Sequence, residues 1–257
     1  MKVACIQMDV KLCEKENNCR KALEMAEKAI AEGAEIIVLP EVFSTGFCYD
    51  NIGEQAERKP YPSLEPFREL SLKHDCVIIG SIIELQGDNQ YSNMGFCIAS
   101  GELTGEYRKT HPFKKENAYF SKGTEIQAFE ITGKSLKIGL EICYEVRFPE
   151  VARKLALQGA DILVTIAQFP DPRRDQWEIL SKARAIENQI PHIACNRTGS
   201  DPGSSFFGKS MIIDALGTIV DEAGREEAVV IGNLDPALVK ETRTFIPVFT
   251  DRRDDLY

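Results

Sequence analysis

A predicted strand meets a predicted helix within Gly139–Glu150, which reads GLEICYEVRFPE. The β-rich run Ser135–Ile142 is expected to end at Cys143. Pro149 suits the first position of a helix, because its φ is preset and its missing N–H would have no partner there. Cys143 is therefore expected at a strand–helix junction, where free backbone N–H groups lower a thiol pKa and can hold an oxyanion. The alternative is an inert cysteine that packs as a small hydrophobe.

Strands and helices alternate on the N-terminal side of this junction. The apolar runs Lys2–Met8 and Glu35–Leu39 predict two strands with a helix between them. Asn17 or Asn18 is expected to cap that helix. Gly33 is expected to end it.

The alternation resumes on the C-terminal side. The predicted elements are the helix Pro149–Gln158, the strand Asp161–Ile166, the helix Gln176–Gln189 and the strand His192–Asn196. The second of these helices is expected to turn Leu180, Ala183 and Ile186 inward. Arg197–Ser205 is rich in glycine, serine and aspartate and reads as a loop. Asp235–Lys240 reads as a short helix.

Antiparallel meanders interrupt this alternation, and the mixture predicts an α/β fold with a mixed sheet and more than one layer. One such meander is predicted over Cys76–Leu85, Tyr91–Ala99 and Glu106–Lys109. A hairpin is predicted through the turn Thr132-Gly133-Lys134. We find no linker, repeat or low-complexity segment, so residues 1–257 are expected to form a single domain.

Composition restricts the possible partners and the compartment. The chain has 257 residues and is 43% hydrophobic, which allows a full core. Its net charge of −9 argues against nucleic acid and anionic membranes as main partners. The N-terminal MKVACIQMDV reads as a strand and no apolar run approaches the length of a membrane span, so we expect a cytoplasmic protein.

The eight cysteines show no C-x-x-C pair and no zinc-ligand spacing. In a chain of this size, disulfides are not needed for stability, and we expect mostly inert buried thiols in a reducing compartment. Pairing of some thiols in an oxidising compartment is the alternative.

Glu41, Lys109 and Cys143 each follow a predicted strand. Loops at the carboxyl ends of strands are where ligands bind in α/β folds. A thiolate attacks an amide carbon, a cation stabilises the anionic intermediate, and a carboxylate transfers the proton to the leaving amine. The three residues therefore suffice for acyl transfer from nitrogen, although spacing alone does not bring them together. Glu41 on its own would read as a solvated loop carboxylate.

No Ser-His-Asp arrangement competes with this set. The three histidines, His74, His111 and His192, lie in no catalytic motif. His192 falls in an apolar strand and is expected to be a core residue. Trp177 is expected to pack and not to contact a ligand.

The chain resembles the carbon–nitrogen hydrolase (nitrilase) superfamily over essentially its whole length. LPE at Leu39–Glu41, YRKTH at Tyr107–His111 and ICYEVRFPE at Ile142–Glu150 resemble the glutamate, lysine and cysteine motifs, in the expected order. The resemblance implies that Glu116 is a second glutamate that positions the lysine or the substrate. It also implies that Tyr144 supplies a backbone N–H to the oxyanion site.

Two residues depart from the pattern of the family. Pro112 stands where relatives often have leucine, and Glu145 replaces a frequent aspartate. Both lie beside the three motif residues and not among them, so they bear on loop detail and not on the chemistry.

The resemblance also implies an architecture and an assembly. The fold of the family is a four-layer α-β-β-α sandwich of two mixed β-sheets flanked by helices. A homodimer or higher homo-oligomer is implied, packed through Glu150–Gln158 and Gln176–Gln189, with the tail at residues 241–257 at the interface. The implied chemistry uses water and needs no cofactor and no metal.

The segments Ala167–Arg173 and Ala183–Gln189 resemble the ω-amidase branch. Such enzymes release ammonia from a small carboxylate-bearing amide through a thioester. Arg173, Lys114 or Lys115 can supply a cation for the carboxylate. Alone, each would read as a solvated surface charge. The candidates for an apolar wall are Phe43, Tyr119 and Phe169.

Several alternatives stay open. A general aliphatic amidase, an N-carbamoyl amine hydrolase and a nitrilase all use the same three residues. A non-catalytic reading is a thiol redox sensor or a dimeric scaffold. A sensor would need neither Glu41 nor Lys109, which favours the enzyme.

Overall fold

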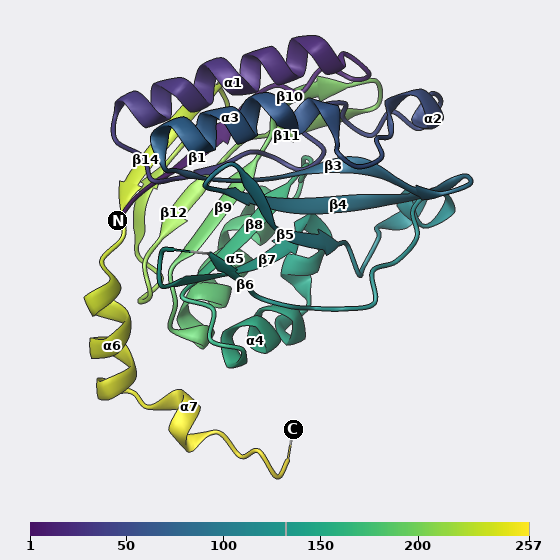
Figure 1. Cartoon of the computed structure of the whole chain (residues 1–257). Coiled ribbons are helices and arrows are strands. Elements are labelled where there is room, and N and C mark those ends of the chain that lie inside the picture. The colour runs from purple at the N-terminus through teal and green to yellow at the C-terminus, as the bar shows by residue number, and fades with distance from the viewer. Residues whose placement is uncertain (132, 257) are drawn as a thin grey trace.

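The computed structural model describes residues 1–131 and 133–256. Within them, two six-stranded mixed sheets face each other and helices cover both outer faces (Figure 1). The predicted α-β-β-α sandwich is therefore confirmed. The predicted turn residue Thr132 and the last tail residue, Tyr257, lie outside the described residues.

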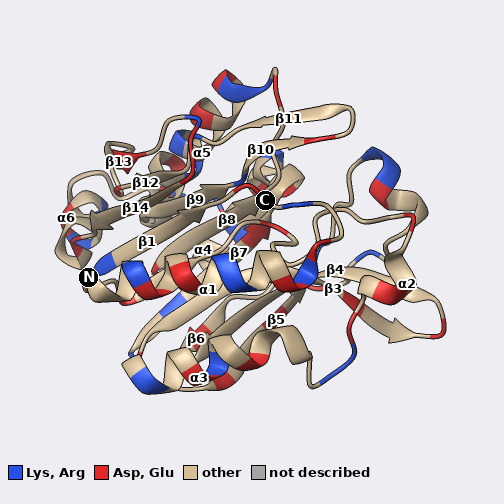
Figure 2. Cartoon of the chain, turned by 90° about the horizontal axis from the view of Figure 1, so that it is seen from above, with Lys and Arg blue, Asp and Glu red and all other residues tan. Residues whose placement is uncertain are grey.

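The first sheet has the order β14-β1-β2-β3-β4-β5. Its strands are β1 Lys2–Gln7, β2 Ile36–Val38, β3 Val77–Gly87, β4 Gln90–Ala99, β5 Glu102–Arg108 and β14 Ala228–Asn233. The strands β1, β2 and β3 are parallel, and the remaining pairs are antiparallel. The helices α1 (Lys15–Ala31) and α3 (Glu65–His74) cover its outer face (Figure 1). Lysine, arginine and acidic residues alternate along their solvent side (Figure 2).

The second sheet has the order β13-β12-β9-β8-β7-β6. Its strands are β6 Phe129–Ile131, β7 Leu136–Ile142, β8 Ile162–Ala167, β9 His192–Asn196, β12 Met211–Ile213 and β13 Ile219–Glu222. Here β7, β8 and β9 are the parallel strands. The helices α4 (Pro149–Leu157) and α5 (Arg174–Asn188) pack on its outer face.

The main core lies between the two sheets, because alternate residues of each strand point inward. Val38 of β2, Leu140 of β7 and Val164 of β8 belong to this one buried cluster. Gly95 of β4 lets the sheets approach, since an added Cβ there would lie 2.6 Å from Leu140 Cδ2. The parallel strands of both sheets thus bring their carboxyl ends to a common region.

The predicted N-cap of α1 was wrong, and the predicted inward face of α5 was wrong in part. Asn17 and Asn18 lie inside α1, which begins at Lys15. Asn18 is buried, and its amide donates to the carbonyls of Lys11 (2.6 Å) and Ser44 (2.9 Å). In α5, Leu180 packs against the main core as predicted, but Ile186 is exposed and the buried residues include Trp177, Ser181 and Arg184. Asn18 of α1 and Arg184 of α5 are buried because their side chains find hydrogen-bond partners in other segments of the chain.

The segment predicted as the loop Arg197–Ser205 contains a hairpin. Its strands are β10 (Thr198–Asp201) and β11 (Ser204–Phe207). Gly203 adopts φ 88°, a conformation that glycine tolerates and that a tight turn uses. The small polar residues that suggested a loop are therefore in part strand residues, of which Ser200, Ser204 and Ser205 are exposed and Thr198 is buried.

The C-terminal segment packs on its own chain. The helix α6 spans Pro236–Phe245, beyond the predicted end at Lys240, and α7 spans Val248–Asp251. The Phe249 ring lies between the guanidinium groups of Arg153 (5.1 Å) and Arg243 (4.6 Å). The tail thus contacts α4, one of the two helices expected to form a dimer interface.

Cys13 and Cys48 form a disulfide, which corrects the expectation of inert thiols for this pair. The Cys13 amide donates to the Thr45 carbonyl (2.8 Å), so the two loops lie side by side. The remaining cysteines of the described residues are free, and among these only Cys19 is partly exposed.

Within the described part of the chain, every helix is too short or too polar to span a bilayer.

Candidate active site

The structure brings Glu41, Lys109, Glu116 and Cys143 together. Glu41 follows β2, Lys109 follows β5 and Cys143 follows β7. The Lys109 Nζ atom lies 2.7 Å from Glu41 Oε1 and 2.9 Å from Glu116 Oε2. All four side chains are buried. The resemblance assigned Glu116 to this group, and both of its carboxylate oxygens lie within hydrogen-bond distance of the Lys109 ammonium.

Neighbouring strand ends fix the Glu41 carboxylate. The Asn93 side chain, on β4, donates to Oε1 (2.8 Å). The backbone N–H of Gln168, which follows β8, donates to Oε2 (2.9 Å). The Gln168 side chain also donates to the Glu41 carbonyl (2.8 Å). Glu41 is therefore pre-oriented by both sheets, and sequence reasoning did not identify Asn93 or Gln168.

Cys143 opens the short 3₁₀ helix η3 (Cys143–Arg147) with φ 51°. A positive φ is uncommon for a residue with a Cβ, and such conformations concentrate at functional sites. Burial and the Glu41 charge raise the pKa of the Cys143 thiol well above its usual range, whereas Lys109 and the Gln168 amide lower it. The thiol is therefore protonated at neutral pH and needs a base to react.

The ammonium between the two carboxyl groups stays charged. Burial lowers the pKa of Lys109, but the Glu41 and Glu116 charges raise it, and the result lies well above the usual value. Burial raises the pKa of Glu116 to about 7, against the lowering effect of Lys109. The site thus keeps a fixed cation beside the thiol, with a second carboxyl group that titrates near neutrality.

A cavity of about 550 Å³ opens onto Cys143 and Glu116. Glu41 and Lys109 lie buried beneath it. The other lining residues are Phe47, Tyr49, Phe113, Lys114, Lys115, Tyr144, Arg147, Gln168, Phe169, Pro170, Arg173, Gln176, Ser204 and Phe206. Its size and apolar walls suit a small organic molecule.

Three of the five predicted substrate contacts line this cavity: Tyr144, Phe169 and Arg173. Phe43 does not, and that prediction was wrong. Its ring packs in the core against Phe67 (5.2 Å between centroids), because its side chain points to the helix side of the first sheet. Tyr119 stacks on Tyr49 (4.4 Å), and it is Tyr49 that reaches the cavity.

Four cations line the cavity against one carboxylate, Glu116. Arg147 was missed by sequence reasoning, although it lies only four residues after Cys143, at the other end of η3. Its guanidinium stacks over Phe169 (5.3 Å) and donates to Gln176 Oε1 (2.6 Å). In residues 1–131 and 133–256, neither Arg147 nor Arg173 has a carboxylate within ion-pair distance.

The predicted structural roles of two other residues are confirmed. His192 is buried, with Nε2 2.6 Å from Thr165 Oγ1 and Nδ1 2.9 Å from the Ser181 carbonyl. Burial lowers its pKa to about 4, so it is neutral. Trp177 is fully buried and donates to the Lys209 carbonyl (2.8 Å).

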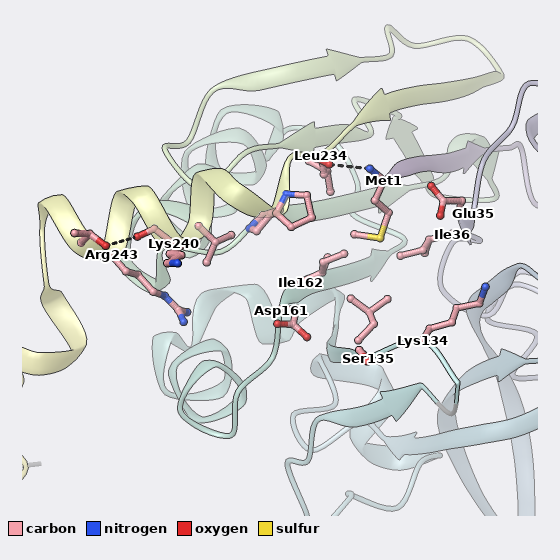
Figure 3. Close-up of a pocket in the computed structure, with 15 residues that line it drawn as sticks. Met1, Glu35, Ile36, Lys134, Ser135, Asp161, Ile162, Leu234, Lys240 and Arg243 are labelled. Carbon is pink, nitrogen blue, oxygen red and sulfur yellow. Dashed lines mark hydrogen bonds between the residues drawn. The ribbon is translucent and has the colours of Figure 1, made fainter.

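A second cavity, of about 670 Å³, lies at the opposite ends of the strands (Figure 3). Ile36 and Ile162, at the starts of β2 and β8, line it together with Lys240 and Arg243 of α6. None of the four residues predicted as catalytic reaches it. The predicted catalytic residues therefore lie at the cavity above Cys143 and not at this second one. The described residues hold no group of three or more His, Cys, Asp or Glu side chains arranged to bind a metal.

The model of the carbon–nitrogen hydrolase family matches residues 2–244. This chain belongs to the carbon–nitrogen hydrolase family. It is 38% identical over 258 residues to a 2-oxoglutaramate amidase of Bacillus subtilis, and the match covers 99% of this chain and 98% of the relative. It is 30% identical over 269 residues to human omega-amidase NIT2, covering 100% of this chain and 96% of the relative.

The solved structures include a closely similar fold. Nit3 of Saccharomyces cerevisiae, of branch 10 of the nitrilase superfamily, superposes with a TM-score of 0.92 at 28% identity. That superposition covers 98% of this chain and 96% of Nit3. The carbon–nitrogen hydrolase fold therefore accounts for the whole arrangement of sheets and helices described above.

Proposed function

We propose that this carbon–nitrogen hydrolase is an amidase that releases ammonia from a small carboxylate-bearing amide. The observation that carries the proposal is a buried Glu41–Lys109 pair beside a cysteine, beneath a cavity rich in unpaired cations. Glu41 is the general base and acid, Lys109 stabilises the oxyanion, and Cys143 is the nucleophile. Glu116 holds the ammonium of Lys109 in place.

The first half-reaction forms a thioester. Glu41 takes the proton of the Cys143 thiol as sulfur attacks the amide carbon, which fits a thiol that is protonated at rest. The resulting oxyanion is stabilised by Lys109 and by the backbone N–H of Tyr144. When the intermediate collapses, Glu41 gives the proton to the departing nitrogen. Ammonia leaves and the acyl group remains on sulfur.

The second half-reaction consumes water. Glu41 takes a proton from a water molecule, and the hydroxide attacks the thioester carbon. The same two oxyanion donors stabilise the second tetrahedral intermediate. Collapse breaks the carbon–sulfur bond, the thiolate takes the proton back from Glu41, and the carboxylic acid leaves.

The substrate class follows from the charges of the cavity. Arg173 and Arg147 line the cavity, and a guanidinium pairs well with a carboxylate. The relatives named 2-oxoglutaramate amidase and omega-amidase support a keto-acid amide in that place. We therefore propose that Arg173 binds the carboxylate of the substrate, with Phe169 and Tyr144 beside its carbon chain.

Ammonia release from five substrates tests this proposal: α-ketoglutaramate, α-ketosuccinamate, a neutral aliphatic amide, an N-carbamoyl amino acid and a nitrile. We expect the keto-acid amides to react fastest. Arg173→Met should raise their KM on the order of tenfold to a hundredfold, as the loss of a charge-assisted hydrogen bond implies. It should leave turnover of the neutral amide unchanged.

Arg174→Met is the matched control, because Arg174 is exposed and does not line the cavity. It should change neither activity. Preferential hydrolysis of the neutral amide, the carbamoyl compound or the nitrile would keep the proposed chemistry and discard the keto-acid class. A wild-type protein that hydrolyses none of the five would contradict the amidase proposal and favour a redox sensor or a scaffold.

We also propose a homodimer that packs through α4 and α5. Leu157, Ile179 and Ile186 leave apolar side chains about half or more exposed on these helices. The tail residues Phe245 and Leu256 are exposed as well. Light scattering on the full chain should give twice the monomer mass, and Ile186→Asp should give a monomer. A monomeric wild type would contradict this assembly.

We also propose a cytoplasmic location, which the free buried cysteines support and the Cys13–Cys48 disulfide does not.

A further inference from the structure

A buried glutamate two residues after Cys143 ties together the segments that carry the cysteine and the lysine. Glu145 is fully buried and belongs to η3. Its Oε1 accepts hydrogen bonds from the Tyr107 hydroxyl (2.7 Å), the Thr110 N–H (2.8 Å), the Thr110 hydroxyl (2.5 Å) and the His111 N–H (3.2 Å). Its Oε2 accepts from the Ile142 N–H (2.8 Å).

These donors come from two places in the chain. Tyr107 and Thr110 lie on either side of Lys109, and Ile142 directly precedes Cys143. One carboxylate therefore holds the segment of the lysine with one oxygen and the strand of the cysteine with the other. The first segment belongs to the first sheet and the second strand to the other, so Glu145 bridges the two sheets at the site.

The carboxylate is ionised. Burial alone would raise the pKa of Glu145, but hydrogen bonds from His111, Thr110, Tyr107 and the Ile142 amide lower it below the usual range. The partners above all donate, and an ionised carboxylate is a pure acceptor. Hydrogen bonds to a charged acceptor are also stronger than neutral ones. The negative charge of Glu145 thus strengthens the hydrogen bonds that these donors make to it.

We propose that Glu145 is a positioning residue that sets Lys109 against Cys143. It touches neither the substrate nor the reacting atoms, and it acts through the two segments it joins. This inference rests on the proposed roles of Lys109 and Cys143. A displacement of about 1 Å in a catalytic group can cost on the order of a hundredfold in rate, so a loosened bridge should appear mainly in kcat.

Glu145→Gln tests the bridge with almost no change in shape. The amide of glutamine has an oxygen that accepts hydrogen bonds and an NH₂ group that donates them. In either orientation of the amide, the NH₂ group faces N–H or hydroxyl groups that donated to the carboxylate. We expect kcat for the preferred amide to fall on the order of a hundredfold with KM within about threefold. Glu145→Asp keeps the charge and should recover part of that loss.

Glu141→Gln is the matched control. Glu141 is also fully buried and lies two residues before Cys143, but among the described residues its carboxyl hydrogen-bonds to Thr165 Oγ1 of β8 (2.6 Å) and not to the lysine segment. Glutamine can accept the same bond. This variant should keep kcat within about threefold of wild type, as expected for a retained hydrogen bond.

A second readout does not need turnover. The rate of Cys143 alkylation by iodoacetamide, followed by mass spectrometry of its peptide, reports the thiol directly. Because Lys109 lowers the pKa of Cys143, a displaced lysine should slow alkylation at pH 8 in Glu145→Gln and not in Glu141→Gln. If wild type hydrolyses no amide, the proposed function fails, while this rate still tests the bridge.

Thermal unfolding separates positioning from general damage. A folded Glu145→Gln variant with wild-type kcat and alkylation rate would overturn the inference. Equal losses in Glu145→Gln and Glu141→Gln would also overturn it. If Glu145→Gln does not fold, Tyr107→Phe removes one donor from the carboxylate and should lower kcat on the order of tenfold in a folded protein. An unchanged kcat in that variant would contradict the bridge.

Discussion

Cys143→Ala abolishes hydrolysis of every amide substrate and leaves the fold and the assembly intact. The reason is that the thioester cannot form without the sulfur atom, and among the described residues that line the cavity Cys143 is the one thiol. Removing a covalent nucleophile lowers kcat on the order of 10⁴ to 10⁶. Ammonia release under saturating substrate, with enzyme at high concentration, measures the residual rate.

The fold should tolerate this change. Cys143 is buried at the edge of the cavity and forms no disulfide. The positive φ at this position should strain alanine and cysteine to about the same extent, since both carry a Cβ. The melting temperature should therefore stay close to that of wild type.

Cys97→Ala is the control for loss of a buried thiol. Cys97 lies in β4, within the core between the sheets, and does not line the cavity above Cys143. It should lower stability slightly and leave kcat unchanged. Wild-type-like turnover by Cys143→Ala would eliminate the thioester route.

The meeting of Glu41, Lys109 and Cys143 could be predicted because it depends on strand ends. Glu41 and Cys143 follow apolar parallel strands and Lys109 follows the last strand of a meander, so all three stand at the carboxyl ends of strands. The resemblance added Glu116, which no periodicity indicates. The four layers followed from the same resemblance together with the alternation of strands and helices.

The cavity wall could not be predicted, because loop side chains obey no period. Phe43 and Phe47 lie four residues apart in one loop, yet only Phe47 reaches the cavity. Tyr49 excludes Tyr119 from it by stacking. Arg147 lies close to Cys143 in sequence, but its place in the wall depends on its contact with the Phe169 ring, which the sequence does not show.

The burial of particular polar side chains could not be predicted either. The helix-capping pattern suggested Asn17 or Asn18, yet the structure uses Asn18 to bind two loop carbonyls. Glu145 looked like a neutral departure from the family pattern and proved to be a fully paired carboxylate. A sequence does not show which polar side chains will find partners from distant strands.

The Lys109→Met variant is expected to lose nearly all activity. The pH dependence of its residual rate should show the cause. Loss of one oxyanion donor lowers kcat on the order of 10² to 10³. Removing the ammonium also leaves Glu41 and Glu116 as buried neighbours with like charge, which raises the pKa of a carboxyl group. Glu116, whose pKa burial already raises to about 7, should then keep its proton to higher pH, so the pH dependence of the residual rate should shift to higher pH than that of wild type.

Breaking a buried ion pair on one side should also cost about 3–5 kcal/mol of stability. The double variant Lys109→Met/Glu116→Gln removes one of the two negative charges that the lysine neutralised. Its unfolding free energy should recover toward that of wild type, as measured by denaturant titration. Activity should not recover with it, because the oxyanion still lacks its cation.

This pair of variants separates two roles of one ammonium. If the double variant regained both stability and turnover, Lys109 would serve only to hold two carboxylates together, and the Tyr144 amide would carry the oxyanion alone. If it regained stability and stayed inactive, the charge itself would be required by the transition state. The second result is expected, since Lys109 is the cation that the structure holds in direct contact with Glu41.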